Sequence, residues 1–191
     1  MALMKHMQLQ PQVMKMRNLS KFKGTPRNNR SFLAYAFSYF TYKILGNILF
    51  SSDMRILVFR FLGAKVGSGV KIGHHVKVRN FRNLQIGDDS WIGEEVWFIN
   101  HEKITIGSNV CISQRAIICS GSHDFRSSSF EHAHKPIEIK DGAWVCLDAK
   151  ILPGVTVGEC SVVSAGEVAR KSIPDNSILV SGEVRSIDPP R

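Results

Sequence analysis

The chain has 191 residues, the length of one ordinary domain. Apolar residues make up 43% of it, enough for a packed core, so a disordered or collagen-like protein is excluded. The cysteines form no C-x-x-C pair and have no regular spacing, so we expect neither disulfides nor a zinc site. They are expected to be small buried residues of a protein in a reducing compartment. They are Cys111, Cys119, Cys146 and Cys160.

The formal net charge of +9 arises at the N-terminal end of the chain. Eight of the 25 Lys and Arg residues precede Asp53, which is the first acidic residue. The remaining basic residues are nearly balanced by the 16 acidic ones. A nucleic-acid-binding domain carries its positive charge on the folded surface, so we expect no nucleic-acid partner.

Residues 1–30 are basic and rich in Met, and we expect a flexible arm there. Residues 31–64 are expected to form a helical segment and a cap, with a short helix at 54–62 covering the open end of the region that follows. The apolar run 32–50 allows three interpretations: a helix packed on the protein or on a neighbouring subunit, a helix lying on an anionic membrane surface, or a membrane span interrupted by Lys43. A secretory signal is excluded by the long polar stretch before it.

From Val66 onward an aliphatic residue recurs at every sixth position within each coil, often followed by Gly. The positions form five groups of three: Val66, Ile72 and Val78; Ile86, Ile92 and Phe98; Ile106, Ile112 and Ile118; Ile139, Val145 and Ile151; Val157, Val163 and Ala169. An amphipathic helix would have an apolar period of about 3.6 residues, and hairpin strands would alternate. A period of six instead predicts short strands and tight turns that form triangular coils, stacked about 4.8 Å apart.

This pattern resembles the left-handed parallel β-helix of the hexapeptide-repeat acyltransferases. The resemblance supplies the left hand, because the spacing itself predicts only a coil. We therefore expect an all-β protein, a left-handed parallel β-helix of about five coils over residues 65–173, followed by a C-terminal tail at 174–191.

The period breaks between residues 78 and 86, 98 and 106, and 118 and 139, each time after the third strand of a coil. All three insertions therefore leave at one corner of the prism, and the last is expected to form a long loop over residues 124–138. At its root stands the segment 120–125, SGSHDF, and His101 follows Asn100 one coil earlier. An imidazole in a polar cluster beside a shielding loop suits proton transfer from a hydroxyl, although a hydrogen-bonded loop histidine is the alternative for His123.

Residues 110–136, VCISQRAIICSGSHDFRSSSFEHAHKP, and the following IEIKDGAWVCLDAKILPGVTVG resemble one branch of that family. This branch is the colanic-acid-type exopolysaccharide O-acetyltransferases, related to the galactoside, maltose and nodulation acetyltransferases, and the resemblance covers most of residues 55–182. It implies a cytoplasmic homotrimer that moves an acetyl group from acetyl-CoA to a sugar hydroxyl of a surface polysaccharide or its lipid-linked precursor, without a metal. The basic arm and the apolar run add an expected peripheral membrane contact through residues 1–52.

The resemblance implies that His123 is the general base, which takes the proton of the sugar hydroxyl in a direct transfer with no acetyl-enzyme. It places Asn100 where the family orients acceptor and base, and a turn asparagine is the alternative. Asp124 either holds the second nitrogen of the imidazole or forms an Asx-turn at the start of the loop.

For acetyl-CoA, the resemblance implies that Trp144 packs against the pantetheine arm and that Leu147 and Ala165 contact the cofactor through their backbone. Arg170 and Lys171 match positions near its phosphates, where two cations suit a polyanion. The alternative for Trp144 is an aromatic side chain that covers the wall of the prism, and the alternative for Arg170 and Lys171 is a solvated basic turn.

The sequence departs from the family pattern in two places. Cys146 and Ser164 replace common glycines, which would narrow the cofactor groove. The tail SGEVRSID lacks the usual C-terminal pattern, which leaves Arg185 as the nearest cation for the CoA nucleotide.

Two other functions stay open. γ-Type carbonic anhydrases build a zinc site from three histidines on the same kind of β-helix, and the candidates here are His74, His75, His101, His123, His132 and His134. The later pair of that family, spaced five apart on the coils, is absent. A non-catalytic scaffold or interaction protein, working through the basic arm, would not require the loop motif or the region around Trp144.

Overall fold

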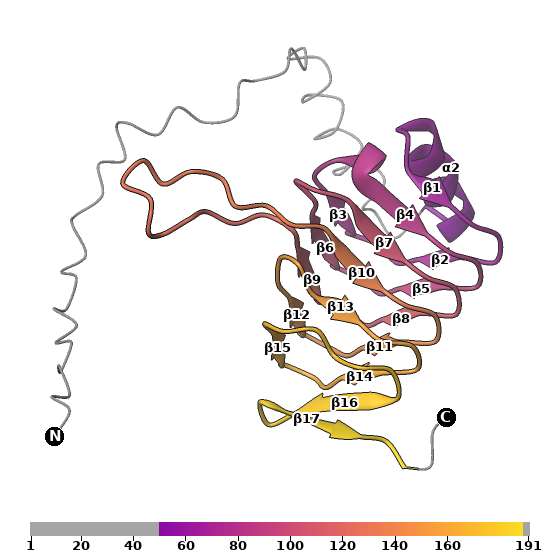
Figure 1. Ribbon diagram of the computed structural model, residues 1–191. Helices are drawn as coiled ribbons and strands as arrows, with labels where there is room; N and C mark the ends of the chain where they lie inside the picture. Colours follow the sequence, from indigo (N-terminus) through magenta and orange to yellow (C-terminus); the bar gives the residue numbers. More distant parts are fainter. Residues whose placement is uncertain (1–49, 189–191) are drawn as a thin grey trace, which may run out of the picture.

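The computed structural model describes residues 50–188 as a three-sided prism of stacked coils, closed by helix α2 (Ser52–Phe61) at one end and a hairpin at the other (Figure 1). The expected arm at 1–30 and the apolar run, except Phe50, lie outside the described residues. Each coil adds one short strand to each of three sheets, and the chain turns at three corners. The first corner joins sheet 1 to sheet 2, the second joins sheet 2 to sheet 3, and the third leads from sheet 3 into the next coil.

The strands alternate among the sheets in chain order. Sheet 1 contains β1 (Lys65–Val66), β4 (Leu84–Ile86), β7 (Ile104–Ile106), β10 (Ile137–Ile139) and β13 (Thr156–Val157). Sheet 2 contains β2 (Lys71–Ile72), β5 (Trp91–Ile92), β8 (Cys111–Ile112), β11 (Trp144–Val145), β14 (Val162–Val163), β16 (Ser177–Val180) and β17 (Glu183–Ser186). Sheet 3 contains β3 (Lys77–Val78), β6 (Trp97–Ile99), β9 (Ile117–Cys119), β12 (Lys150–Ile151) and β15 (Val168–Ala169), and a 3-10 turn, η2 (Phe81–Asn83), precedes β4.

Parallel pairing joins each strand to its equivalent one coil away, in the register that the six-residue period predicts. Along sheet 1 the inward column runs from Val66 through Ile86, Ile106 and Ile139 to Val157. These inward columns form the core cluster, in which most side chains are fully buried. The predicted all-β parallel solenoid with five complete coils is confirmed, and it continues into part of a sixth coil.

The glycines after the aliphatic positions have a steric cause. A Cβ on Gly87 would lie 2.6 Å from the carbonyl carbon of Gly107 in the next coil, and a Cβ on Gly73 would lie 2.7 Å from the amide nitrogen of Glu94. No side chain fits at such separations, so glycine allows the corners of successive coils to stack closely.

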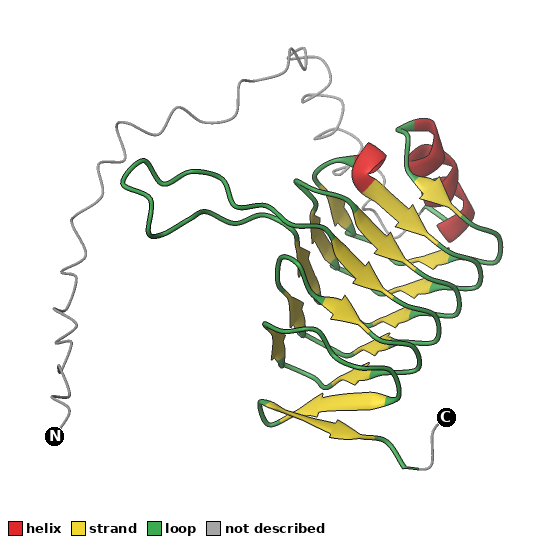
Figure 2. Ribbon diagram, in the orientation of Figure 1, coloured by secondary structure: helices red, strands yellow, loops and turns green. Residues whose placement is uncertain are grey.

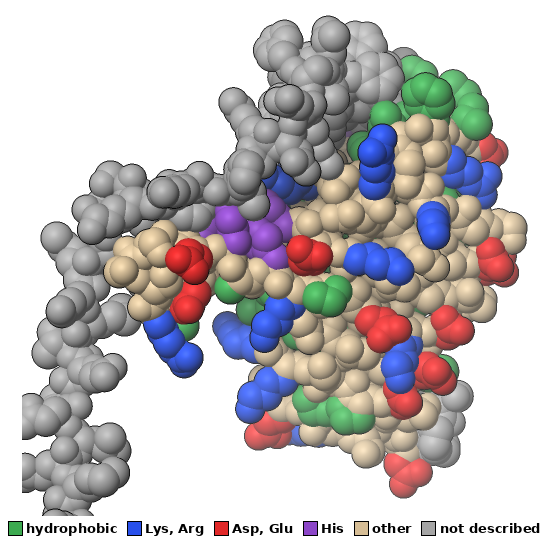
Figure 3. Space-filling view, turned by 45° about the horizontal axis from the view of Figure 1, so that its top comes forward, with side chains coloured by type: hydrophobic (Ala, Val, Ile, Leu, Met, Phe, Trp, Pro, Cys, Tyr) green, Lys and Arg blue, Asp and Glu red, His purple; other side chains and the backbone are tan. Residues whose placement is uncertain are grey.

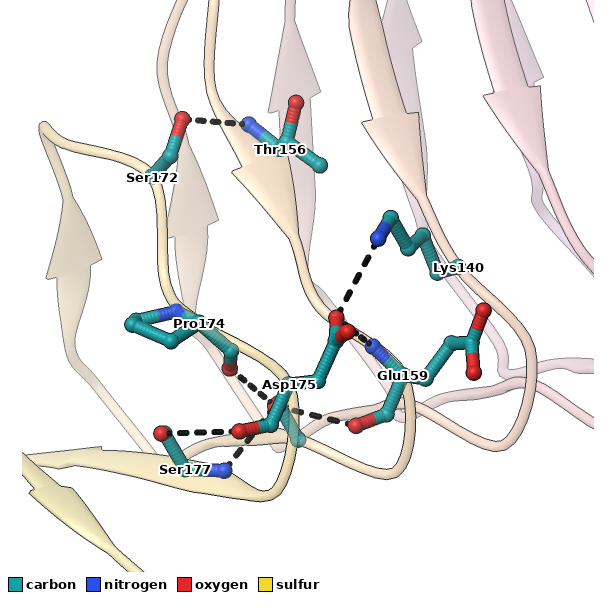
Figure 4. A network of polar contacts seen from close by, with 8 residues as sticks. Lys140, Thr156, Glu159, Ser172, Pro174, Asp175 and Ser177 are labelled. Carbon is teal, nitrogen blue, oxygen red and sulfur yellow. Dashed lines mark hydrogen bonds and ion pairs between the residues drawn. The ribbon is translucent and has the colours of Figure 1, made fainter.

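Carboxylates bind the first corner of one coil to the next. In the last coils Asp175 accepts a 2.8 Å hydrogen bond from the backbone N–H of Glu159 and pairs with Lys140 Nζ at 3.2 Å (Figure 4). The same contact is made, at 2.8 Å each, by Asp88 with the N–H of Ser68 and by Asp141 with the N–H of Ser108. The charged carboxylate thus satisfies a backbone donor that the turn leaves unpaired.

Buried hydroxyls make a second link at this corner. Ser161 is fully buried; its hydroxyl donates to the carbonyl of Pro174 at 2.6 Å and accepts from the N–H of Ser177 at 3.0 Å. Ser90 makes the equivalent pair of bonds with Gly107 and Val110. Polar groups inside the prism are therefore satisfied by the next coil, as buried polar groups must be.

Helix α2 covers the open end of the first coil, as predicted, although it spans 52–61 and not 54–62. Ser51 caps its N-terminus by accepting from the N–H of Met54. Ile56 and Phe59 are buried against the coils, and the Arg55 guanidinium donates to the carbonyl of Ile72 at 2.9 Å. This face of the helix thus caps both the apolar core and an unpaired strand carbonyl.

The opposite face of α2 carries Met54, Leu57 and Phe61, whose exposed fractions are 46%, 64% and 80%. The spacing places all three on one stripe of the helix. Between residues 50 and 188 no helix combines the length and apolarity needed to cross a bilayer.

The expected C-terminal tail at 174–191 contains regular secondary structure, the strands β16 and β17. Ile173 bridges to Val157 and β16 pairs in parallel with β14, which begins a sixth coil. The chain then reverses at Ser181 and Gly182, which have positive φ, and β17 returns antiparallel to β16. The antiparallel partner covers the strand edge at which coil stacking ends.

Candidate active site

The long loop leaves the prism at the third corner, between β9 and β10, and extends well away from it (Figure 2). Strand β10 begins at Ile137, so the loop ends at Pro136 and not at Glu138 as expected. Its two arms run antiparallel at the root: His123 bridges to His132, and the N–H of Ala133 donates to the carbonyl of Ser122 at 2.9 Å. The root is therefore held by backbone pairing.

Four imidazoles gather at this root, and they form the purple patch beside the loop in Figure 3. The ring centroids of His101 and His134 are 4.4 Å apart, those of His134 and His132 4.5 Å, and those of His132 and His123 4.7 Å. Only His123 and His101 were singled out from the sequence as candidates for this site. From the sequence, His132 and His134 are candidates only for a zinc site, since nothing in the sequence shows that the loop folds back onto its own root.

His123 is oriented by a residue that sequence reasoning missed. Its Nδ1 lies 2.8 Å from the carbonyl oxygen of Phe130, and the two rings are stacked at 4.2 Å with an angle of 6°. A carbonyl can only accept, so Nδ1 carries the proton and Nε2 carries the lone pair of the neutral ring. His123 is thus set as a base at Nε2, with its plane held by the Phe130 ring.

The contacts of Asn100 and Asp124 differ from the expected roles. Asn100 is fully buried, and its side chain accepts from the N–H of Asn80 at 2.9 Å and donates to the Asn80 carbonyl. The Asp124 carboxylate accepts from the N–H of Arg126 at 2.9 Å, which is an Asx-turn. Asn100 therefore holds the third corner of the preceding coil, and the second nitrogen of His123 is held by Phe130 and not by Asp124.

Burial and positive charge act on the other rings. Desolvation, followed by the charge of Arg79 and the neighbouring imidazoles, lowers the pKa of His101 to about 4. Desolvation, the imidazole of His123 and Arg79 also lower the pKa of His132. For His134 the largest cause of a lowered pKa is again desolvation, and Glu102 opposes it. These rings are therefore neutral at neutral pH.

The expected acetyl-CoA residues lie elsewhere on the prism. Trp144 is 41% exposed on sheet 2, where its indole N–H donates to Ser113 Oγ at 2.9 Å. Leu147 and Ala165 are exposed at the second corner, whereas Arg170 and Lys171 are exposed at the third corner, two coils beyond the loop. Within one chain, the first three are therefore not brought to the corner that holds His123.

Among residues 50–188 no group of three or more His, Cys, Asp or Glu side chains is arranged to hold a metal ion. The four clustered rings contact one another face to edge or tilted, with their closest centroids 4.4 Å apart. Imidazoles that share a zinc ion instead converge on it with nitrogen atoms at about 2.0–2.1 Å. The zinc site of a carbonic anhydrase is not formed by this cluster.

Comparison with known proteins agrees with this architecture. No family model matches the chain. A protein of Escherichia coli K12 named as a colanic acid biosynthesis acetyltransferase, WcaF, is 38% identical over 124 residues, which are 65% of this chain and 68% of that protein. A protein of Schizosaccharomyces pombe named as an acetyltransferase, C18B11.09c, is 36% identical over 109 residues, 55% of this chain and 52% of the relative.

Among solved structures, the hexapeptide-repeat acetyltransferase VCA0836 of Vibrio cholerae in complex with acetyl-CoA superposes with a TM-score of 0.73 at 25% identity, covering 92% of this chain and all of that one. A galactoside acetyltransferase in complex with coenzyme A gives a TM-score of 0.68 at 24% identity, covering 80% and 82% of the two chains. The predicted left-handed hand of the β-helix is confirmed by these neighbours. The chain therefore belongs to the hexapeptide-repeat acetyltransferases, in the group of the colanic acid biosynthesis acetyltransferases.

Proposed function

We propose that the protein transfers the acetyl group of acetyl-CoA to a hydroxyl of a sugar that belongs to a surface polysaccharide or to its lipid-linked precursor. The orientation of His123 carries the proposal, because the Phe130 carbonyl at 2.8 Å leaves Nε2 as the basic nitrogen. The name of the Escherichia coli relative supports the polysaccharide, and the acetyl-CoA complex of the Vibrio cholerae neighbour supports the donor.

The reaction follows from that orientation. His123 Nε2 takes the proton of the acceptor hydroxyl while the hydroxyl oxygen attacks the thioester carbon. The C–O bond forms, the C–S bond breaks, and the proton passes from the imidazole to the leaving sulfur, giving free CoA and an acetyl ester. No enzyme nucleophile is needed, and an acetyl group trapped on Cys119 or Ser122 would contradict direct transfer.

Asn100 and Asp124 act in this proposal through the structure that they hold. Asn100 joins the third corner to Asn80 one coil away, so it fixes the backbone from which the next residue, His101, extends. Asp124 starts the loop with its Asx-turn, which sets the path that returns Phe130 to His123. Both are positioning residues, because neither side chain contacts the base.

Two subunits complete the site in our proposal. Trp144, Leu147 and Ala165 lie on sheet 2 and at the second corner, and His123 lies at the third corner of the same prism. A homotrimer that sets the second corner of one copy against the third corner of the next would line one acetyl-CoA groove from both. Arg170 and Lys171 would then meet its phosphates.

Mixed oligomers test the shared site. Chains with His123→Ala and chains with Trp144→Ala are each expected to be nearly inactive alone. Co-expressed, they should form some interfaces with both native residues, so that activity rises well above that of either variant. Activity that never exceeds the two parents would show that each chain holds its own complete site.

Calorimetric titration with acetyl-CoA tests the donor before any acceptor is known. We expect saturable binding near one site per chain, weakened by Trp144→Ala. Trp91→Ala is the matched control, because Trp91 is an exposed tryptophan of the same sheet, 55% exposed, two coils away under Lys71. A folded protein that does not bind acetyl-CoA would favour a scaffold instead.

The α2 end of the prism is proposed to face the cytoplasmic surface of the membrane. The exposed stripe of Met54, Leu57 and Phe61 follows the apolar run 32–50 in the sequence, and the basic residues of the first 50 positions suit anionic lipid. The full chain should sediment with anionic vesicles, and Leu57→Ser together with removal of residues 1–49 should abolish this. Unchanged sedimentation would contradict the membrane contact.

A further inference from the structure

The third corner also carries a cation, Arg79, one coil before His101. Arg79 follows β3, and its backbone N–H pairs with the carbonyl of Phe98. Its positive charge acts on His101, His132 and His134. The ion pairs in the described part of the chain are His74–Glu94, Arg115–Asp148, Lys140–Asp175 and Arg185–Glu183, and Arg79 takes part in none of them.

A buried donor lies within the histidine cluster. His134 Nδ1 accepts from the N–H of Ser122 at 3.0 Å, so the proton of the neutral ring is on Nε2. This Nε2–H is buried and has no hydrogen-bond partner within residues 50–188. A buried N–H without an acceptor is unfavourable, which indicates that a ligand atom supplies the acceptor.

His101 closes the group from the preceding coil. A Cβ on Gly121 would lie 2.6 Å from His101 Cδ2, so the absence of a side chain at Gly121 lets the imidazole lie against the next coil. Its ring centroid is then 4.4 Å from that of His134. The negative charge of Glu102 acts in the opposite direction and raises the pKa of His134. Arg79 thus supplies the positive charge beside the neutral rings, His134 supplies a donor, and Glu102 is the acidic group that acts on His134.

We infer that Arg79, His101 and His134 form a subsite for an anionic group carried by the acceptor sugar, beside the hydroxyl that His123 activates. The inference rests on the proposed function. The centroids of His123 and His134 are 6.4 Å apart, a separation that one sugar ring can bridge between a hydroxyl and a charged substituent. The class of acceptor is therefore a sugar phosphate or a uronic acid, and not a neutral sugar.

An anion here would satisfy each group at once. It accepts the His134 Nε2–H, pairs with the Arg79 guanidinium, and opposes the charge of Arg79, which is the second cause, after burial, of the lowered pKa of His101. Binding is therefore expected to raise the pKa of His101 and to draw a proton onto the ring at mildly acidic pH. The groups that set this response are Arg79, Glu102 and the imidazoles of the cluster.

The experiment compares the binding of glucose 1-phosphate, glucuronate and glucose to the full chain by saturation-transfer NMR at low salt. We expect at least one charged sugar to bind about tenfold more tightly than glucose, because hydrogen bonds to charged groups are the stronger ones. Arg79→Gln should remove most of this preference. Arg82→Gln is the matched control, since Arg82 is an exposed arginine near the same corner whose side chain lies next to Gly63.

A preference for glucose 1-phosphate supports a phosphate and a preference for glucuronate supports a carboxylate. Equal binding of all three sugars, no binding of any, or an equal loss in Arg79→Gln and Arg82→Gln overturns the subsite. Acetyl transfer to neutral sugars, abolished by His123→Ala but without charge preference, would overturn the subsite and leave the proposed function intact. A preference for charged sugars in a protein that does not transfer acetyl groups would support the subsite and overturn the proposed function.

Discussion

The first and third corners of the prism follow the same repeat and are used differently. At the first corner, Asp175 and Ser161 bind the backbone of neighbouring coils, and their polar atoms have partners. At the third corner the chain carries every insertion, and His134 Nε2 is buried without a partner in the described residues.

The difference separates stability from function within one repeat. Polar atoms that are paired in this way have nothing left to offer a ligand. A corner that leaves a buried donor without a partner among the described residues can bind a ligand, and it depends on the other corners for its rigidity. Substitutions at the third corner should therefore reduce activity, and substitutions at the first should reduce stability.

The largest effect is expected at the base. His123→Ala should lower the rate of acetyl transfer by about 10²–10⁴-fold, the usual contribution of a general base. The thermal midpoint should change little, because the ring is only partly buried in a loop. The measurement is release of CoA with a sugar acceptor, and Ser161→Ala, at the first corner, should keep the native rate at a temperature where it is folded.

Ser161→Ala should have the next largest effect, on stability. It leaves the N–H of Ser177 and the carbonyl of Pro174 without their buried partner, which costs about 1–3 kcal/mol. Urea unfolding measures the loss.

Ser120→Ala is its counterpart at the third corner, because Ser120 is fully buried and its hydroxyl accepts from the N–H of Glu102 at 2.9 Å. A similar loss of stability is expected, together with lower acetyl transfer, since the His101 backbone lies next to that bond. If both serine variants lose only stability, the two corners do not differ as proposed.

The effect of pH on stability should be smaller than the effects of these substitutions, and it should be confined to acidic pH. The pKa of His101 is lowered to about 4 from its ordinary value of 6.5, so the unfolded chain binds a proton that the folded ring refuses between these values. Stability is thus complete above pH 6.5 and falls as the pH decreases toward 4. His101→Phe should flatten this part of the curve of thermal midpoint against pH, and an unchanged curve would contradict the burial of His101.

Much of the fold follows from side-chain burial that repeats locally. Ile86, Ile106 and Ile139 stack because each coil is the same length, and a period of six is visible without any knowledge of distant contacts. The insertions were equally visible, since they interrupt that period. The hairpin of β16 and β17 was not, because the aliphatic spacing changes once the coils end.

The site was less predictable, for physical reasons that differ from residue to residue. His123 could be chosen as an imidazole at the root of a loop. Phe130 could not, because its contact is made by a backbone carbonyl, and every residue has one. An asparagine at position 100 could hydrogen-bond either the acceptor sugar or a neighbouring backbone, and only the fold shows that its amide bonds the backbone of Asn80.

The smallest effect should come from the exposed carboxylate of the first corner. The N–H of Glu159, and then Lys140, hold the pKa of Asp175 below its ordinary value, so its stabilising contribution is present above that value and disappears as the pH falls through the lower one. Asp175→Asn keeps the shape and removes the charge, so we expect a small loss of stability at neutral pH that vanishes in acid. Thermal midpoints at two pH values measure it, and Asp88→Asn, at the other end of the first-corner row, is the matched variant for the activity assay. Activity should be unchanged in both variants, because neither carboxylate lies at the third corner; a loss of acetyl transfer would mean that the first corner contributes to the site itself.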